Sequence, residues 1–257
     1  MAKKLEELVK KKHFLAVGVV FLLGVFLRFY KLAGFVTFLG DQGRDTIIIK
    51  RILSFEHFPA IGPPTSIGQV YLGPFYYYFI SPWLALFNFD PLGLAFGVAV
   101  FSSLYILINY LVVKELLNEK IALISTILVA FSSTLIEFSR FSWNPNLLPL
   151  FSLLTVYFLI KSLKTHDWRF YALTGAFLSF SIQLHYLALF LIPPVISFFA
   201  LLALEQRKKL KQIFLGGLML IASFFLFSVP LVIFALRQDF LNSRSFLNLF
   251  KTTSGVL

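Results

Sequence analysis

Long apolar stretches separated by short polar segments dominate the chain. Apolar runs lie at about 13–30, 91–113, 121–138, 147–160, 170–184, 187–204 and 213–236. Each reaches or approaches the roughly 20 residues that a helix needs to cross the hydrocarbon core of a bilayer. A β-barrel would show short segments of alternating polarity instead. The pattern therefore predicts an all-α polytopic membrane protein with about seven transmembrane helices.

The aromatic stretch 71–90 is also long enough to span, but it carries Pro74 and Pro82. Most Lys and Arg residues fall in four clusters, at 3–12, 114–120, 161–169 and 207–211. Basic clusters between apolar spans mark cytoplasmic loops. If all four are cytoplasmic, then 71–90 must begin and end outside. We therefore expect seven spans, a cytoplasmic N-terminus and an embedded juxtamembrane helix in 71–90, because eight spans would misplace the basic loops.

This topology gives the chain one main domain. We expect residues 1–240 to form a single transmembrane module, with a first outer region at 31–90 that carries juxtamembrane helices. Its loop of about 31–70 is unusually long for a connection, and long loops are usually functional. Residues 241–257 are the expected start of an outer segment.

Composition supports the membrane class and excludes others. The hydrophobic fraction of 58% and mean hydropathy of +0.84 exceed those of soluble domains. The net charge of +11 does not indicate a nucleic-acid partner, because the basic residues cluster between spans. The chain has no cysteine, which rules out disulfides and thiol chemistry, and its four scattered histidines give no zinc cluster.

The most unusual polar segment follows the first apolar run. Asp41, Arg44 and Asp45 place three charges within five residues, beside a segment that must lie in lipid. The residues after Asp41 predict a short interfacial helix from 42 to about 55. Its apolar side is expected to comprise Ile47, Ile48, Ile52 and Phe55. Asp41 is then either a helix N-cap, a position that favours Asp in any protein, or part of a reaction centre.

Further polar residues collect on the expected outer surface. Glu137 and Arg140 are three apart and can pair if they share a helix. Such a pair serves either as a structural tie or as a ligand site, since ionisable residues within a membrane segment usually face a polar interior. Residues 141–146 are expected to form an outer turn, and His185 lies at the tip of a helical hairpin.

Four motifs together resemble a bacterial branch of the family 39 glycosyltransferases. They are Asp41-Gln-Gly-Arg-Asp45, Gly62-Pro-Pro-Thr-Ser66, Gly73-Pro-Phe-Tyr-Tyr-Tyr78 and Ser139-Arg-Phe-Ser-Trp-Asn-Pro-Asn146. Relatives in this family include protein O-mannosyltransferases and lipid A aminoarabinose transferases, which share the C-type membrane fold. The order of motifs covers about 15–236. Full-length members usually continue well beyond 257 residues, so the chain is either a fragment or a minimal copy.

The resemblance implies transfer of a sugar from a polyprenyl-phosphate donor, at the extracytoplasmic face of the cell membrane. The acceptor is a lipid, a glycan or a protein. Many members keep an acidic pair in the first outer loop, but here Asp41 is followed by Gln42, which leaves Asp45 as the nearest second acid. Many also place Asp after the Ser-Arg motif, where this chain has Asn144 and Asn146. A divalent cation, Mg²⁺ or Mn²⁺, would therefore have Asp41 as its main ligand.

The chemistry of this transfer suits particular side chains. A carboxylate can take the proton of an acceptor hydroxyl, which favours Asp41 as base with Asp45 as the second catalytic candidate. Guanidinium groups bind phosphate, which favours Arg44 and Arg140 for the donor. The remaining substrate-binding candidates are Tyr76, Tyr77 and Trp143 for stacking, and His57, Asn144 and His185 for polar contacts.

Two other classes of function are considered. A lipid-linked sugar flippase or transporter would place its charges at mid-membrane, often in two repeated halves. Here the charges lie in the outer loop and no halves are evident. A non-catalytic membrane protein of envelope assembly is the second alternative, because the second acid of the usual pair is absent.

Overall fold

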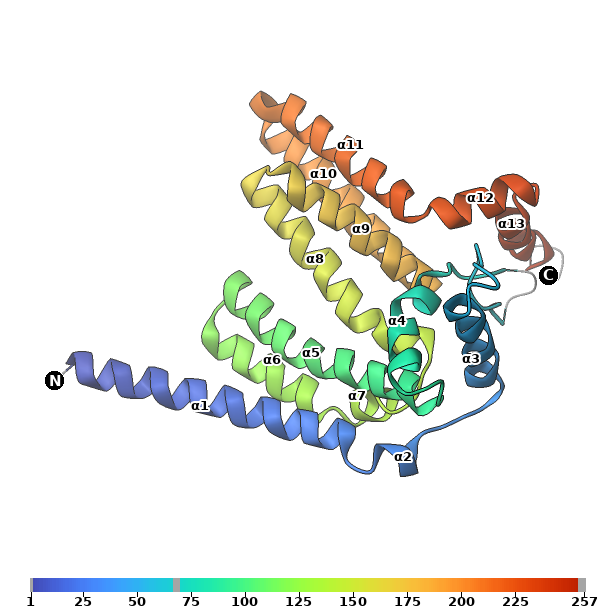
Figure 1. Cartoon of the computed structure of the whole chain (residues 1–257). Coiled ribbons are helices and arrows are strands. Elements are labelled where there is room, and N and C mark those ends of the chain that lie inside the picture. Colours follow the sequence, from blue (N-terminus) through green and yellow to red (C-terminus); the bar gives the residue numbers. More distant parts are fainter. Residues whose placement is uncertain (1, 67–69, 254–257) are drawn as a thin grey trace. The chain divides into compact units, whose positions relative to one another are not determined.

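The computed structural model describes residues 2–66 and 70–253, and its regular elements in those ranges are helices (Figure 1). Extended pairing in this part of the chain is confined to one isolated bridge between Pro64 and Tyr71. The expected all-α fold is thus confirmed. The chain divides into two compact units, residues 1–43 with 83–150 and residues 44–82 with 151–257. The end of the expected outer segment, 254–257, lies outside the described residues.

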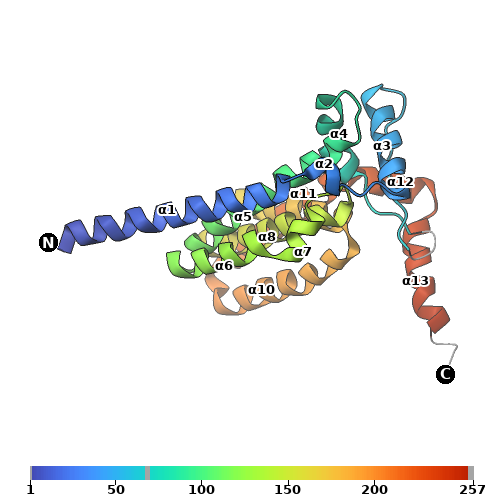
Figure 2. The same cartoon turned by 90° about the horizontal axis from the view of Figure 1, so that it is seen from below.

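Three long helices form the core of the first unit. Its elements are α1 (Ala2–Phe29), α2 (Leu32–Phe35), the start of α3 (Gly40–Leu53), α5 (Leu92–Leu116), α6 (Glu119–Phe131), α7 (Ser133–Phe138) and the 3-10 helix η1 (Asn144–Leu147). Helices α1, α5 and α6 pack against one another and lie side by side in both views (Figures 1 and 2). Their contact includes Ile106, Val129 and Ala130. A Cβ on Gly24 would lie 2.6 Å from Ile106, so glycine allows this close approach.

The second unit is a group of four long helices with shorter elements at its ends. It contains most of α3, most of α4 (Phe75–Leu86), α8 (Leu148–Thr165), α9 (Trp168–Leu184), η2 (Tyr186–Leu191), α10 (Ile192–Glu205), η3 (Arg207–Lys209), α11 (Leu210–Phe227), α12 (Val229–Arg237) and α13 (Leu241–Thr253). Helix α11 packs against α9 and α10. Tyr171 and Leu220 belong to the buried cluster between α9 and α11, and a Cβ on Gly175 would collide with the Leu220 carbonyl.

Within the described residues, five helical segments are long and apolar enough to cross a membrane. They are Lys11–Phe29, Leu92–Leu116, Asn144–Thr165, Tyr186–Glu205 and Arg207–Phe227. The expected span at 121–138 is divided into α6 and α7 at Ser132, whose hydroxyl caps α7 by accepting the Leu135 N–H at 3.3 Å. The expected span at 170–184 is α9, which has 17 residues. The structure therefore supports five spans, and the count of seven stays a prediction.

The segments of the first outer region are short helices. Helix α4 has 12 residues, so it rises only about 18 Å, less than the ~30 Å of a bilayer core. This agrees with an embedded helix in 71–90 that does not span. Helix α3 begins at Gly40, so Asp41 lies inside its first turn instead of at the N-cap. Its inner side also differs from the expected one, because Ile49 and Ile52 are buried whereas Ile47 and Phe55 are exposed.

Candidate active site

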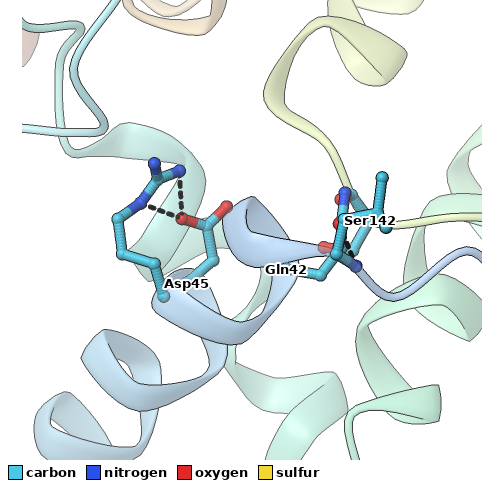
Figure 3. A network of polar contacts seen from close by, with 5 residues as sticks. Gln42, Asp45 and Ser142 are labelled. Atoms are coloured by element: carbon cyan, nitrogen blue, oxygen red, sulfur yellow. Dashed lines mark hydrogen bonds and ion pairs between the residues drawn. The ribbon is translucent and has the colours of Figure 1, made fainter.

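Gln42 fixes the start of α3 to the loop that follows α7. Its side chain is only 6% exposed. The Oε1 atom accepts the backbone N–H of Leu39 at 2.9 Å, and the Nε2 atom donates to the carbonyl of Ser142 at 2.9 Å (Figure 3). The two residues of this second bond are 100 positions apart in sequence. The start of the first-loop motif, residues 41–43, is therefore adjacent to the Ser139–Asn146 motif within the first unit.

Asp41 precedes this anchor and is exposed at the first turn of α3. A carboxylate at this position is stabilised by the partial positive charge at a helix N-terminus. Exposure leaves it accessible to a molecule that approaches the unit. Because Gln42 holds the helix start in place, the Asp41 backbone is held beside the loop containing Ser142.

Trp143 and Asn144 lie directly after the anchored carbonyl and differ in exposure. The Trp143 side chain is 36% exposed and its ring is stacked with those of Phe138 and Phe141, with interplanar angles of 21° and 24°. Asn144 is 1% exposed, and neither its amide oxygen nor its amide nitrogen has a hydrogen-bond partner among the described residues. Buried amides are normally paired, so Asn144 has unused capacity for a polar group.

Arg140 lines a cavity of about 440 Å³ in the first unit. The lining residues are Phe35, Thr37, Ser133, Ile136, Glu137, Arg140 and Phe141. One guanidinium nitrogen, Nη2, donates to the Leu27 carbonyl, and the group lies 4.6 Å from the centre of the Phe35 ring. Its Nε atom is buried and has no partner within the described residues. Leu27 and Phe35 thus hold the guanidinium in place, while its Nε–H remains able to donate a hydrogen bond.

The expected ion pair between Glu137 and Arg140 is not formed, although both line this cavity. Helix α7 ends at Phe138, and Ser139 is its C-cap. Arg140 therefore lies beyond the helix, and the spacing rule for residues three apart does not apply to it. Glu137 is exposed. The wall of the cavity thus contains the carboxylate of Glu137 and the guanidinium of Arg140.

Sequence reasoning missed Arg28, which is fully buried in the first unit. Its Nε donates to the Ser102 hydroxyl at 2.8 Å. Its terminal nitrogens donate to the carbonyls of Gly24, Ala130 and Val129 at 3.0 to 3.1 Å. The last two carbonyls belong to the final turn of α6, where a helix has no N–H partners of its own. Arg28 thereby ties α1 to the end of α6, just before the break at Ser132.

Arg44 and Asp45 belong to the second unit and bind each other. The Nε and Nη2 atoms of Arg44 donate to one oxygen of Asp45 at 3.0 and 2.8 Å (Figure 3). Asp45 is fully buried, whereas the Arg44 side chain is 30% exposed. Burial, followed by the negative charge of Asp45, raises the pKa of the Tyr77 hydroxyl. Asp45 is thus partly neutralised by Arg44 and inaccessible from the surface.

The other aromatic and histidine candidates also lie in the second unit. Tyr76 and Tyr77 are 0% and 1% exposed, so they are covered by protein and not open to stacking on a sugar in this conformation. His57 is exposed. The Nδ1 atom of His185 accepts the Leu187 N–H at 3.1 Å, which caps η2, and burial lowers the pKa of its imidazole. A pocket shared by Asp41, Arg140 and His185 stays a prediction, because His185 belongs to a different unit.

The part of the chain that the structure describes has no group of three His, Asp or Glu side chains that could hold a divalent ion. Asp45, the nearest second acid to Asp41 in sequence, is bound to Arg44. Mg²⁺ and Mn²⁺ prefer several oxygen ligands, and one exposed carboxylate with a neutral Gln42 beside it does not fit that preference.

A family model described as dolichyl-phosphate-mannose-protein mannosyltransferase matches residues 72–233, which is more than half of the chain. A search of curated proteins finds no match. The matched range contains Arg140, Trp143, Asn144 and the anchoring carbonyl of Ser142, but it does not reach Asp41. The hydrogen bond from Gln42 to the Ser142 carbonyl joins the Asp41 segment to the matched region.

Proposed function

The chain belongs to the dolichyl-phosphate-mannose-protein mannosyltransferase family, and from this premise we propose that Asp41 is the general base of its sugar transfer. Membership makes the protein a multi-pass membrane glycosyltransferase that uses a lipid-phosphate sugar donor. Beyond family membership, the proposal names the residues that act in the transfer. It also takes the acceptor group to be a hydroxyl and places the reaction at the extracytoplasmic side of the membrane. The basic clusters at 161–169 and 207–211 support this side, since such loops face the cytoplasm.

In the proposed reaction, the Asp41 carboxylate takes the proton of the acceptor hydroxyl. The acceptor oxygen forms a bond to the anomeric carbon of the sugar, and the bond from that carbon to the phosphate oxygen breaks. The electron pair of the broken bond stays on the phosphate, so the products are the glycosylated acceptor and the polyprenyl phosphate. Asp41 fits the role better than Asp45 because it is exposed, whereas Asp45 is buried against Arg44.

Arg140 is proposed to stabilise the negative charge that grows on the departing phosphate. Its guanidinium is anchored on one side by Leu27 and by the Phe35 ring, and it lines a cavity of about 440 Å³. A preorganised donor of this kind stabilises developing charge without having to reorient during the reaction. Trp143 offers an exposed aromatic face for the sugar, and Asn144 offers an amide whose hydrogen bonds are unused.

The observation that carries the proposal is the bond from Gln42 to the Ser142 carbonyl. It places the segment with the exposed carboxylate next to the segment with the anchored guanidinium. Acid–base and phosphate-binding groups must be held close together for such a transfer, since positioning supplies much of the rate. In sequence these groups are about 100 residues apart, and only the fold brings their segments together.

The test is transfer of a labelled sugar from a polyprenyl phosphate by purified protein in lipid vesicles. We expect Asp41→Asn to lower the turnover rate by roughly 10²–10⁴-fold, the usual contribution of a general base. Asp90→Asn is the matched control. Asp90 is also exposed in the first unit, and its carboxylate accepts the N–H of Leu92, the first residue of α5, at 2.8 Å. This control should retain activity.

Two further variants separate the carboxylates. Glu137→Gln tests an exposed acid that lines the Arg140 cavity in the first unit, and Asp45→Asn tests the buried acid that is bound to Arg44. Unchanged transfer by Asp41→Asn together with loss in Glu137→Gln would reassign the base to Glu137. If all three variants transfer sugar normally, no carboxylate of this region is the base and the proposal fails.

A further inference from the structure

A long apolar groove runs between α10 and α11 in the second unit, with Leu178 of α9 at its floor. Its volume is about 680 Å³, and every residue that lines it is apolar. The small residues Ala200 and Ala203 on α10 and Gly217 on α11 are among those that line it. Both helices belong to segments that can cross a membrane, so the groove is open to hydrocarbon chains.

A basic cluster lies in the turn at one end of this groove. Helix α10 ends at Glu205, and α11 begins at Leu210, and between them η3 carries Arg207, Lys208 and Lys209. Ala203 and Leu210, which flank this turn, both line the groove. All three basic side chains are exposed, and none forms an ion pair within residues 2–66 and 70–253. Their charges are therefore available to an anionic group.

A second loop adds an interfacial surface at the same end of the unit. The Nε2 atom of His166 lies 2.9 Å from the Oε1 atom of Gln206, which joins the loop between α8 and α9 to the turn containing η3. Trp168 follows in this loop and is 60% exposed, with Arg169 over its ring at 5.9 Å. An exposed Trp beside basic residues is typical of the membrane–water boundary.

We propose that this groove and the η3 cluster together bind one anionic glycerophospholipid. The lipid phosphate lies against Arg207, Lys208 and Lys209, and one acyl chain occupies the groove between α10 and α11. Basic pockets between transmembrane helices bind anionic lipid head groups in this way. A soluble anion has no acyl chain to occupy the apolar lining. A zwitterionic lipid has no net negative charge to balance the three basic side chains.

The sugar donor also combines a phosphate with a long apolar chain, but the topology of the second unit argues against it here. The segment Tyr186–Glu205 is long enough to cross the membrane. His185 lies at one end of it and η3 at the other, so the two lie on opposite membrane faces. The groove with the basic end is therefore a separate lipid site on the face away from His185.

The test uses a tryptophan placed in the groove. Phe214 lines the groove and is 67% exposed, so Phe214→Trp in a background of Trp83→Phe, Trp143→Phe and Trp168→Phe reports on groove occupancy. Brominated phosphatidylglycerol or brominated phosphatidylcholine is added at equal mole fractions, and fluorescence quenching is compared. We expect the apparent preference for the anionic lipid to be at least about fivefold, the amount that one favourable charge contributes at a membrane surface.

Removing the three charges should abolish that preference. In Arg207→Ala, Lys208→Ala, Lys209→Ala the quenching by the two lipids should become equal. The matched control is Lys11→Ala, Lys12→Ala, Lys120→Ala, which removes the same charge from exposed positions in the first unit and should keep the preference. Gly217→Leu fills the groove, and its Cβ meets only the Phe199 ring at 3.5 Å. It should lower quenching by both lipids.

Three results would overturn the proposal. Equal quenching by both lipids in the starting protein would mean ordinary bilayer contact. An equal loss of preference in both triple variants would mean that net charge alone attracts the lipid. If unbrominated polyprenyl phosphate relieves the quenching more strongly than the same excess of unbrominated phosphatidylglycerol, the groove belongs to the prenyl lipid instead.

Discussion

Replacing Gln42 by Leu should slow sugar transfer without removing any reacting group. The change keeps a side chain of similar length in a position that is 6% exposed. It deletes the bond that Leu39 donates to the Gln42 oxygen and the bond that the Gln42 nitrogen donates to the Ser142 carbonyl. The consequence is local, because these bonds fix the first turn of α3, where Asp41 lies, to the loop after α7.

The magnitude follows from the two lost bonds. Each net hydrogen bond contributes about 0.5–1.5 kcal/mol, so the docking of the α3 start loses roughly 1–3 kcal/mol. A loss of 1.4 kcal/mol is about a tenfold change in a population, and a displacement near 1 Å can cost about 100-fold in rate. We therefore expect turnover to fall by roughly 5- to 100-fold. The Michaelis constant for the donor should change less, since Arg140 is anchored independently on Leu27 and Phe35.

The matched control is Gln183→Leu in the second unit. Gln183 is also buried, at 2% exposure, and its amide donates to the Ser179 hydroxyl at 3.0 Å and the Phe227 carbonyl at 2.9 Å. Both variants should lose similar stability, measured as a fall in melting temperature. Only Gln42→Leu should combine the fall in turnover with faster amide hydrogen exchange at residues 40–46.

The reasoning is refuted if Gln42→Leu increases exchange at 40–46 while turnover stays at the level of the starting protein. It is also refuted if both variants lose turnover in the same proportion to their loss of melting temperature. In that case Gln42 would stabilise the fold without positioning Asp41. Gln42→Glu keeps the acceptor for Leu39 but not the donor to Ser142, so it should fall between the starting protein and Gln42→Leu.

Three other changes test single features. A Cβ on Gly62 would collide with the Gly73 carbonyl oxygen, so Gly62→Ala should lower the yield of folded protein in size-exclusion chromatography, whereas Gly43→Ala, with its nearest atoms at 3.9 Å, should not. Arg28→Met removes the donor to three buried carbonyls. Each carbonyl costs about 1–3 kcal/mol when it is left unpaired, so the melting temperature should fall strongly. Arg28→Lys should restore part of the loss. Burial lowers the pKa of His185, so its contribution to stability is present above about 6.5 and is lost as the pH falls through the lowered pKa. The melting temperature should therefore fall on acidification in the starting protein and fall less in His185→Gln.

Hydropathy predicted the helices well because burial in lipid imposes long apolar runs. The segments at 13–30, 91–113, 147–160 and 187–204 each correspond to a described segment able to span, whereas 213–236 is divided at Ser228 between α11, which belongs to such a segment, and α12. The pattern could not show that 121–138 is divided, since Ser132 is a mild polar residue that helices tolerate. It becomes a break because its hydroxyl caps α7 and its backbone is extended.

Side-chain direction was harder to predict than helix position. Tyr76, Tyr77 and Tyr78 are consecutive, and successive helical positions differ by about 100° in direction. The first two point into the protein, whereas Tyr78 is 36% exposed and donates to the Pro59 carbonyl at 2.8 Å. A run of aromatics carries no periodicity that would separate an inner from an outer face. Two of the residues expected to stack on a sugar, Tyr76 and Tyr77, are therefore covered by protein.

The candidate site could be predicted only as a set of motifs. The order of Asp41-Gln-Gly-Arg-Asp45 and Ser139–Asn146 predicts that they act together, and the bond from Gln42 to Ser142 joins residues 41–43 to the second motif within the first unit. Sequence reasoning treated Gln42 as the place of a missing acid. In the structure, Gln42 acts as a neutral amide, which accepts a hydrogen bond from Leu39 and donates one to Ser142 at the same time. A carboxylate has no donor for the second bond when it is ionised.

Arg28 and the cavity-lining Arg140 both bind the ends of helices. The periodicity of apolar residues does not reveal contacts of this kind. Arg28 donates to carbonyls in the last turn of α6, and Arg140 donates to the Leu27 carbonyl in the last turn of α1. Carbonyls at these positions have no N–H partner within their own helix and carry partial negative charge. A buried guanidinium is costly without partners, and a helix that ends in an apolar environment leaves carbonyls that need donors. Each arginine thus meets the requirement of a helix end, because Arg28 binds carbonyls left unpaired by the break at Ser132, and Arg140 binds a carbonyl at the end of α1.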